Sequence, residues 1–205
     1  MQSVVNSFDH TFYELISWKH LINNYLMALL LSLTLKQSTV GVSLLYSLAF
    51  GNETQDVVLH PMFQSQSVSG FWAKQWNIAV HQGLKNGVYK PVRSYTNSKV
   101  MGVLAAFVAS GAIHEYVNLV LTPTVQFKWK YMMFFGWNAC LIFVEYAIGS
   151  IDMVQNLLIA NMPKPLITAV VLCTALPVAH LFTGDWIVHG YFDSLMYPEM
   201  SILCR

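Results

Sequence analysis

The stretch "VMGVLAAFVASGAIHEYVNLVL", residues 100–121, is an apolar run that carries two adjacent ionisable side chains, His114 and Glu115. A helix needs about 20 mostly apolar residues to cross roughly 30 Å of hydrocarbon. The run reaches that length, and "RSYTNSK" before it and "TPTVQFKWK" after it are turn-like or charged. It therefore predicts a membrane-spanning helix that places an imidazole and a carboxylate inside the bilayer.

The whole chain has the composition of an integral membrane protein. Of its 205 residues, 55% are hydrophobic and only 10% are charged, whereas soluble domains carry about 25% charged residues. The net charge of +1 gives no reason to expect nucleic acid as a partner. The cysteines Cys140, Cys173 and Cys204 are far apart and show neither a disulfide framework nor a metal-ligand spacing. We therefore expect residues 1–205 to form a single membrane domain with no bound metal.

Three further apolar runs predict spans, over Leu21 to Phe50, Tyr131 to Ser150 and Leu166 to Phe182. The first is interrupted by "LKQST" around Lys36, so it is either one long helix or two short ones. A last segment, Ile187 to Cys204, carries several polar and charged residues and is expected at the membrane interface. The sequence therefore predicts an all-α polytopic membrane bundle of four to five transmembrane helices.

The stretch "FWAKQWNIAVHQGLKNG", residues 71–87, predicts an amphipathic helix that lies in the membrane interface. Its polar residues recur at spacings of three and four, so they share one face: Lys74, Asn77, His81 and Lys85. Trp72 and Trp76 lie on the opposite face with Ala79, Val80 and Gly83, and tryptophan favours the headgroup level. The loop from residue 51 to 99 is rich in Lys, which indicates the cytoplasmic side. A plain membrane-surface anchor is the alternative reading.

His114 is the ionisable residue whose position in a span most suggests a function. Ser110, His114 and Asn118 form one polar stripe, and the small residues beside it leave room for a neighbouring helix or a ligand. A buried imidazole that stays neutral can accept a proton from a hydroxyl. It could equally relay a proton in a transporter or bond to another helix, and spacing leaves these readings open. Glu145, in another span, is expected to pair with a neighbouring helix.

Two motifs in order, "FWAKQWN" at 71–77 and "VASGAIHEY" at 108–116, resemble the signatures of the membrane-bound O-acyltransferases. The first is similar to the FW-x-x-x-WN block of the wax synthase branch. The approach "HPMFQSQSVSGFW" at 60–72 and the linker "GVYKPVRSY" at 87–95 are also similar to that branch. The His-Glu-Tyr triplet is closer to the sterol and diacylglycerol acyltransferases. The resemblance places a wax synthase-like core at about 51–150.

The resemblance implies acyl transfer from acyl-CoA, as a co-substrate, to a lipid hydroxyl at the endoplasmic reticulum membrane. His114 matches the catalytic histidine of the family and would be the general base. Asn77 matches the asparagine of the first motif and would position or polarise the reacting groups. Glu115 could orient the acceptor hydroxyl. Charge and position on the predicted helix, rather than the resemblance, suggest three residues that meet the CoA phosphates at the cytoplasmic mouth: Lys74, His81 and Lys85.

The expected acceptor is a long-chain alcohol, which gives a wax ester, and a sterol or terpenoid is the alternative. From a different class, the chain could be a non-catalytic membrane subunit or a fragment of a proton-coupled transporter. A proton relay needs His114 but has no use for Asn77. Family members usually have more spans than this chain, so it is expected to be the C-terminal part of the fold and a partial catalytic unit. It departs from wax synthases at Gly70 and at the Lys74–Gln75 pair.

Overall fold

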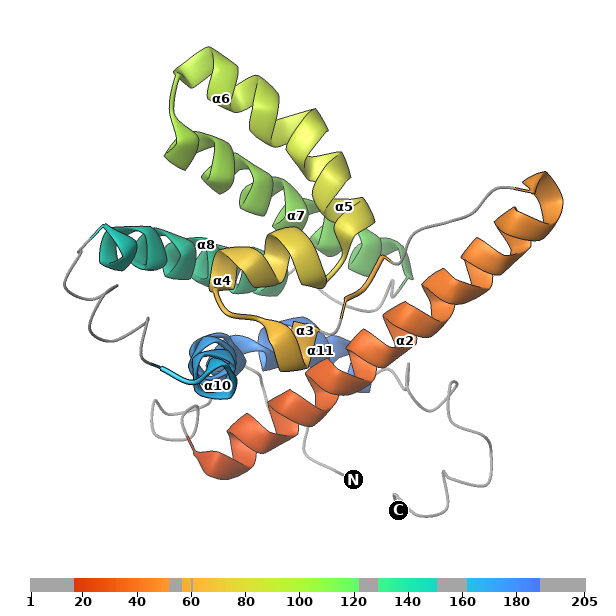
Figure 1. Ribbon diagram of the computed structural model, residues 1–205, viewed down its shortest axis with the longest axis horizontal. Helices are drawn as coiled ribbons and strands as arrows, with labels where there is room; N and C mark the ends of the chain where they lie inside the picture. The colour runs from red at the N-terminus through yellow and green to blue at the C-terminus, as the bar shows by residue number, and fades with distance from the viewer. Residues whose placement is uncertain (1–16, 52–56, 60, 122–128, 151–161, 189–205) are drawn as a thin grey trace.

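The computed structural model of the chain describes residues 17–51, 57–59, 61–121, 129–150 and 162–188. All secondary structure in these ranges is helical, as the sequence predicts (Figure 1). In chain order the elements are α2 (Trp18–Phe50), α3 (Pro61–Gln64), α4 (Val68–Gly70), the π-helix η1 (Phe71–Gln75), α5 (Ile78–Leu84), the π-helix η2 (Lys85–Tyr89), α6 (Lys90–Thr96), α7 (Lys99–Leu121), α8 (Lys130–Gly149), α10 (Lys164–Ala175), the 3-10 helix η4 (Leu176–Val178) and α11 (His180–Val188).

Three helices in the described part of the chain are long and apolar enough to cross a membrane: α2, α7 and α8. The first apolar run forms one continuous helix of 33 residues, so of the two readings the single long helix is the correct one. Its polar residues cause no break because their hydroxyls bond back into the helix. Thr34 Oγ1 donates to the carbonyl of Leu30, and Thr39 Oγ1 donates to the carbonyl of Lys36.

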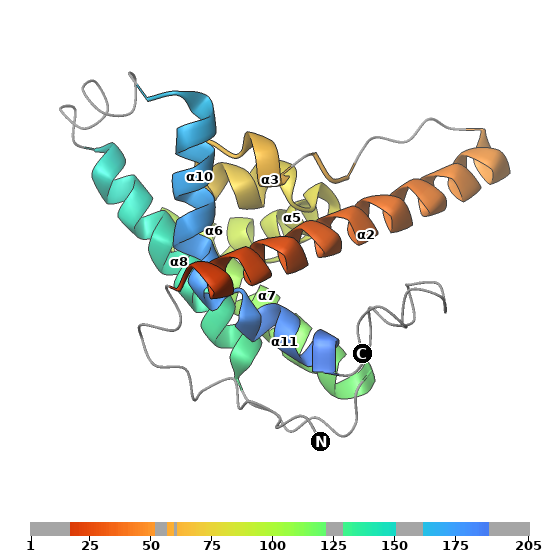
Figure 2. The same ribbon diagram turned by 90° about the horizontal axis from the view of Figure 1, so that it is seen from below.

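The fourth predicted span is divided rather than continuous. Pro177 lies in η4, between α10 and α11. Proline has no backbone N–H and clashes with the preceding turn, so it ends or kinks a helix. Figure 2 shows α10 and α11 running in different directions from this break. The 12-residue α10 is therefore a shorter apolar helix. Residues 189–205, with most of the predicted interfacial segment, lie outside the described ranges.

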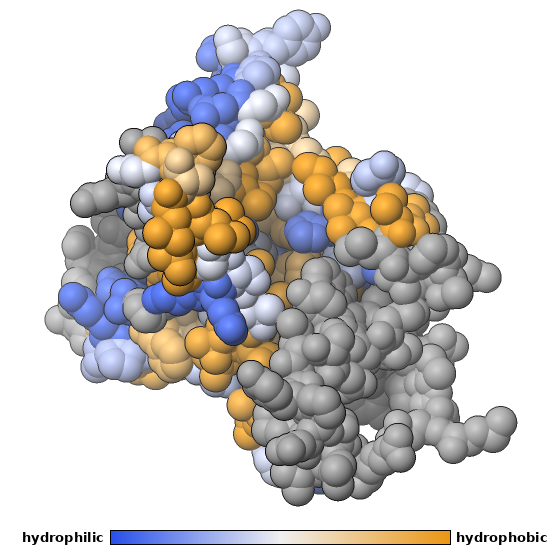
Figure 3. Space-filling view, turned by 90° about the vertical axis from the view of Figure 1, so that its right-hand side faces the viewer, coloured by the Kyte–Doolittle hydropathy of each residue, from blue (hydrophilic) through white to orange (hydrophobic). Residues whose placement is uncertain are grey.

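The buried core lies where α8 meets α2, α10 and α11. It consists mainly of aromatic and branched side chains: Leu31, Met62, Tyr131, Phe134, Phe135, Leu172, Leu176, Ala179, Leu181 and Phe182. Large apolar side chains also point outward, and on α2 Leu45 is 69% and Leu48 75% exposed. A membrane would cover such side chains with lipid. Hydrophilic side chains gather instead at the end of the molecule where α6 lies (Figure 3).

The amphipathic helix predicted over residues 71–87 is wrong as a single helix, because the helix is interrupted at Asn77. This residue has an extended backbone (φ −155°, ψ 94°) and separates η1 from α5. Asparagine favours helix N-caps because its side chain bonds to free backbone N–H groups. The segment 57–59 supplies the remaining partners: Leu59 N donates to Gln75 O at 2.9 Å, and Ile78 N to Val57 O at 2.9 Å.

Trp72, one of the two tryptophans that the sequence places at the interface, packs against neighbouring helices. Its ring packs against aromatic side chains of α7 and α8, with ring centroids 5.9 Å from Phe107 and 5.6 Å from Phe135. Its Nε1–H donates to Asn138 Oδ1 at 3.1 Å. An indole N–H that finds a buried acceptor needs no water. The indole therefore helps to join η1 to α8.

The close approach of α7 and α8 depends on Gly111. A Cβ at this position would lie 2.7 Å from Met132 Sδ and 3.0 Å from Met132 Cα. Small residues at helix crossings let backbones approach in membranes. The expectation that small residues beside the polar stripe make room for a neighbouring helix is therefore correct at Gly111.

Gly111→Ala should lower the thermal unfolding temperature in detergent, because the added methyl pushes against the backbone of α8. Overpacking of this kind typically costs about 1–3 kcal/mol. Gly136→Ala is the matched control, because nothing lies within 4 Å of a Cβ placed there. It should leave the unfolding temperature unchanged or raise it. Equal effects of the two substitutions would contradict this account of the crossing.

Candidate active site

A cavity of about 430 Å³ opens between α2, the η1–η2 region, α7 and α8. Its walls are mostly apolar, with a few polar side chains among them. Ligand sites in proteins commonly have volumes of about 300–1,000 Å³ and this kind of lining. Four of the six predicted site residues line it together: Asn77, His81, Lys85 and His114. The fold thus unites residues of the two motifs, although more than 30 positions separate Asn77 from His114.

Aromatic side chains surround the half-buried His114. Its ring stacks on Phe135 at 5.2 Å and on Tyr131 at 5.8 Å between centroids. Phe182 of α11 meets it edge-on at 4.9 Å. Tyr131 and Phe135 are four residues apart on α8, so they lie on one face and hold the imidazole together. These contacts restrict the ring to one place in the wall of the cavity.

Asn77 has its orientation set by the helix it begins. Its Oδ1 accepts a hydrogen bond from the Val80 backbone N–H at 3.1 Å, which caps α5. Because the carbonyl oxygen of the amide is engaged in this way, the Nδ2 hydrogens are the groups that this side chain can offer as donors. The residue also lines the cavity. The helix break that the sequence did not reveal is therefore what orients this side chain.

His81 and Lys85 lie one turn apart on the same side of the α5–η2 segment. Burial lowers the pKa of His81 below its usual value, and the positive charge of Lys85 lowers it further. The imidazole is therefore neutral at pH 7 and offers a hydrogen bond rather than a charge. Lys85 is exposed and carries the positive charge at this part of the cavity.

Two predicted site residues lie elsewhere. Glu115 is only 4% exposed, and its Oε1 accepts a hydrogen bond from the Tyr131 backbone N–H at 3.0 Å. It joins α7 to the start of α8 and does not line the cavity. Lys74 is exposed on η1 and is also absent from the cavity wall. The spacing of the polar residues puts Lys74 and Asn77 on one face only if the helix is unbroken.

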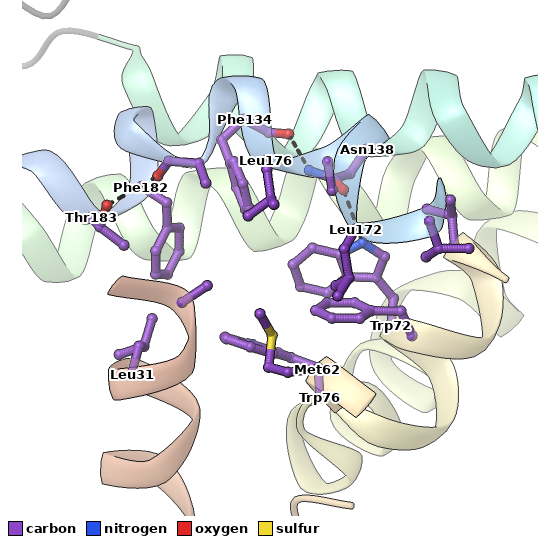
Figure 4. A pocket seen from close by; sticks show the side chains of 16 residues that line it. Leu31, Met62, Trp72, Trp76, Phe134, Asn138, Leu172, Leu176, Phe182 and Thr183 are labelled. Carbon is purple, nitrogen blue, oxygen red and sulfur yellow. Dashed lines mark hydrogen bonds between the residues drawn. The ribbon is translucent and has the colours of Figure 1, made fainter. Parts of the chain in front are cut away.

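A second, smaller cavity of about 60 Å³ lies beside the first and is almost wholly apolar. Figure 4 shows Trp72, Trp76 and Met62 facing Leu172 and Leu176 across it. Leu31, Trp72, Trp76 and Phe182 line both cavities. The two cavities are therefore adjacent and are separated by these side chains.

The sequence gave no reason to single out Asn138. It is fully buried on α8, where its Oδ1 accepts from Trp72 and its Nδ2 donates to the Phe134 carbonyl at 2.9 Å (Figure 4). A lone asparagine in an apolar run is a weak signal of such a role. Its significance follows from its partner, Trp72, which belongs to the first motif.

Residues 56–137 match the profile of the membrane bound O-acyl transferase family. The chain is 30% identical over 122 residues to a probable long-chain-alcohol O-fatty-acyltransferase 9 of Arabidopsis thaliana, a match that covers 56% of this chain and 35% of that protein. It is 31% identical over 103 residues to an acyl-CoA–sterol O-acyltransferase 1 of the same plant, covering 45% of this chain and 30% of that protein.

The human diacylglycerol O-acyltransferase 1 is 39% identical over 66 residues, which cover 32% of this chain and 13% of that protein. No solved structure gives a significant match. The chain thus spans about a third of the length of the two plant relatives. The matched region contains both motifs, and with them Asn77, which caps α5, and His114, which lines the cavity. Over residues 56–137, therefore, the chain is similar to the membrane bound O-acyl transferase family.

Proposed function

We propose that this chain takes part in transferring a fatty acyl group from acyl-CoA to the hydroxyl of a long-chain alcohol, at the endoplasmic reticulum membrane. The observation that carries the proposal is that His114, Asn77 and Lys85 line one largely apolar cavity. Ester formation from a thioester is catalysed by a general base and by a hydrogen-bond donor to the carbonyl oxygen, and a cation can bind the phosphates of CoA. The relatives named as long-chain-alcohol O-fatty-acyltransferases support the same reaction.

In the proposed reaction His114 accepts the proton of the alcohol as its oxygen attacks the thioester carbonyl. The new C–O bond forms and the C–S bond breaks, and the proton passes from the imidazolium to the departing thiolate of CoA. The Nδ2–H of Asn77 donates to the carbonyl oxygen as negative charge develops there. Apolar walls keep out water, which would otherwise compete with the alcohol for the thioester.

The acceptor alcohol is tested directly with membranes from cells that express the chain. They are incubated with labelled acyl-CoA and a panel of long-chain alcohols and sterols, and the labelled esters are separated. We expect wax ester as the main product, and none with the His114→Ala chain. If sterol ester is the main product, the acceptor is a sterol and not a long-chain alcohol. The match to the sterol O-acyltransferase supports this second acceptor. The proposal would be contradicted if no ester formed above the His114→Ala background, either with the chain alone or with the N-terminal region of a plant relative co-expressed.

We also propose that the chain supplies the C-terminal part of the family fold and needs further spans for a complete site. The relatives are about three times as long as the segment that they share with this chain. The three candidate spans and the shorter apolar helix α10 support this proposal, because the family resemblance implies more spans than these. The ester assay is therefore also run with the N-terminal region of a plant relative co-expressed. Full turnover by this chain on its own would contradict the proposal of a partial unit.

Lys85 is proposed to bind the phosphates of CoA, because it is the exposed cation in the cavity wall. Lys85→Ala should raise the KM for acyl-CoA by about tenfold with little effect on kcat, since a charge-assisted hydrogen bond contributes about 1.5 kcal/mol or more. Lys74→Ala should have a smaller effect, because Lys74 lies outside the wall. Lys90→Ala on α6 is the control. Equal effects of the three substitutions on the KM would show that only the overall charge matters.

A further inference from the structure

The helix α8 supports both motifs of the site. Phe135, Asn138, Ile142 and Glu145 recur along it at spacings of three and four, so they share one face. On this face His114 stacks on Phe135, and the indole of Trp72 lies against the same ring. The position of the first motif relative to the histidine therefore depends on how each of them is held on α8.

Glu145 holds the start of the segment that leads to Asn77. Its carboxylate accepts hydrogen bonds from the backbone N–H groups of Val68 and Ser69, the latter at 3.3 Å, and from the Ser69 hydroxyl. These N–H groups belong to the first turn of α4 and have no carbonyl partner within that helix. An ionised acceptor makes such bonds about twice as strong as a neutral one does. The expectation that Glu145 pairs with a neighbouring helix is therefore correct, and that helix is α4.

From this anchor the chain runs through η1 to Asn77 without a loop. α4 ends at Gly70 and η1 begins at Phe71. Midway, the Trp72 indole is bonded to Asn138, which lies about two turns before Glu145 on the same face of α8. At the far end the Gln75 side chain accepts from the Ser65 hydroxyl at 2.7 Å. Because the segment is short and η1 follows α4 directly, a displacement of its start also shifts its end.

We propose that Glu145 is a positioning residue for acyl transfer. By holding the start of α4 on α8, it fixes the segment from Val68 to Asn77, and with it the Asn77 amide, relative to His114. A carboxylate inside a membrane helix is costly and is kept where it has a specific partner. This inference rests on the proposed function, because it assigns Glu145 an effect on the reaction of that site.

The kinetic test compares Glu145→Ala and Glu145→Gln with the control Val144→Ala, the neighbouring position on α8 that is 53% exposed. Glu145→Ala should lower kcat by about 10²-fold, because a misplacement of about 1 Å can have an effect of that size. The KM for acyl-CoA should change little. Glu145→Gln, whose amide oxygen still accepts hydrogen bonds, should restore most of the turnover. Val144→Ala should behave like the unmodified chain.

Coupling separates a positioning role from a purely structural one. In a chain that already carries Asn77→Ala, Glu145→Ala should cause little further loss, because residues that act through one another are not additive. The same fold-loss in both backgrounds would overturn the inference.

A distance measurement tests the inference without activity. Spin labels are placed at Lys74→Cys on η1 and Val108→Cys on α7, both exposed, in a chain without native cysteines. Glu145→Ala should broaden the distance distribution between the labels, and Val144→Ala should not. A distribution unchanged by Glu145→Ala would overturn the inference. Absence of ester from the unmodified chain would contradict the proposed function instead, and the distance would still decide the role of Glu145.

Discussion

His114→Ala should abolish measurable ester formation while the chain still inserts into membranes at a normal level. Loss of a general base typically lowers the rate by about 10²- to 10⁴-fold. The ring is held by Tyr131, Phe135 and Phe182, so its position in the cavity wall does not depend on the substrate. The measurement is labelled ester per unit of chain in the membrane fraction. The measurement must use conditions in which the unmodified chain is active, with the N-terminal region of a relative co-expressed where that is needed.

The control is Ile113→Ala, at the preceding position on α7, which is 53% exposed and lies outside the cavity wall. It should keep near-normal turnover. His114→Gln, which has a polar group of similar size but no basic nitrogen, should be as inactive as His114→Ala. If His114→Ala retains near-normal turnover at normal expression, the residue has a structural role through its aromatic contacts.

Asn77→Ala should lower kcat by about 10²- to 10³-fold, the range seen when a donor to a developing oxyanion is removed. It also removes the cap of α5, which typically costs about 1 kcal/mol of stability. The two losses must be separated, because the Oδ1 atom caps Val80 while the Nδ2 hydrogens are proposed to act on the substrate. Turnover and thermal unfolding are therefore measured on the same preparations.

Asn77→Asp separates them, because an ionised carboxylate still accepts the Val80 N–H but has no hydrogen to donate. It should unfold near the temperature of the unmodified chain and yet be as slow as Asn77→Ala. Activity that follows the unfolding temperature across the two variants would indicate that Asn77 matters only as a cap. His114 would then act as the base without a hydrogen-bond donor from Asn77.

Local patterns in the sequence were sufficient for the helical class and the positions of the long apolar helices. Four of the six predicted site residues line the cavity, whereas Glu115 and Lys74 do not. Hydropathy over about 20 residues reflects the thickness of a bilayer, so it needs no knowledge of neighbours. The polar spacing of Asn77, His81 and Lys85 survives the helix break because most of that face lies in α5 and the turn after it. Pro177 was also visible, and its lack of an N–H was reason enough to expect the division of the fourth run.

Contacts between distant segments decided the rest. The break at Asn77 is stabilised by backbone bonds to residues 57–59, and no pattern within 71–87 contains those partners. Trp72 turns inward because a buried acceptor, Asn138, lies 66 positions further along the chain. Glu115 accepts a hydrogen bond from the backbone at the start of α8 and does not line the cavity. Whether a polar side chain faces a ligand or a backbone group depends on what packs against it, and only the tertiary structure of the chain determines that.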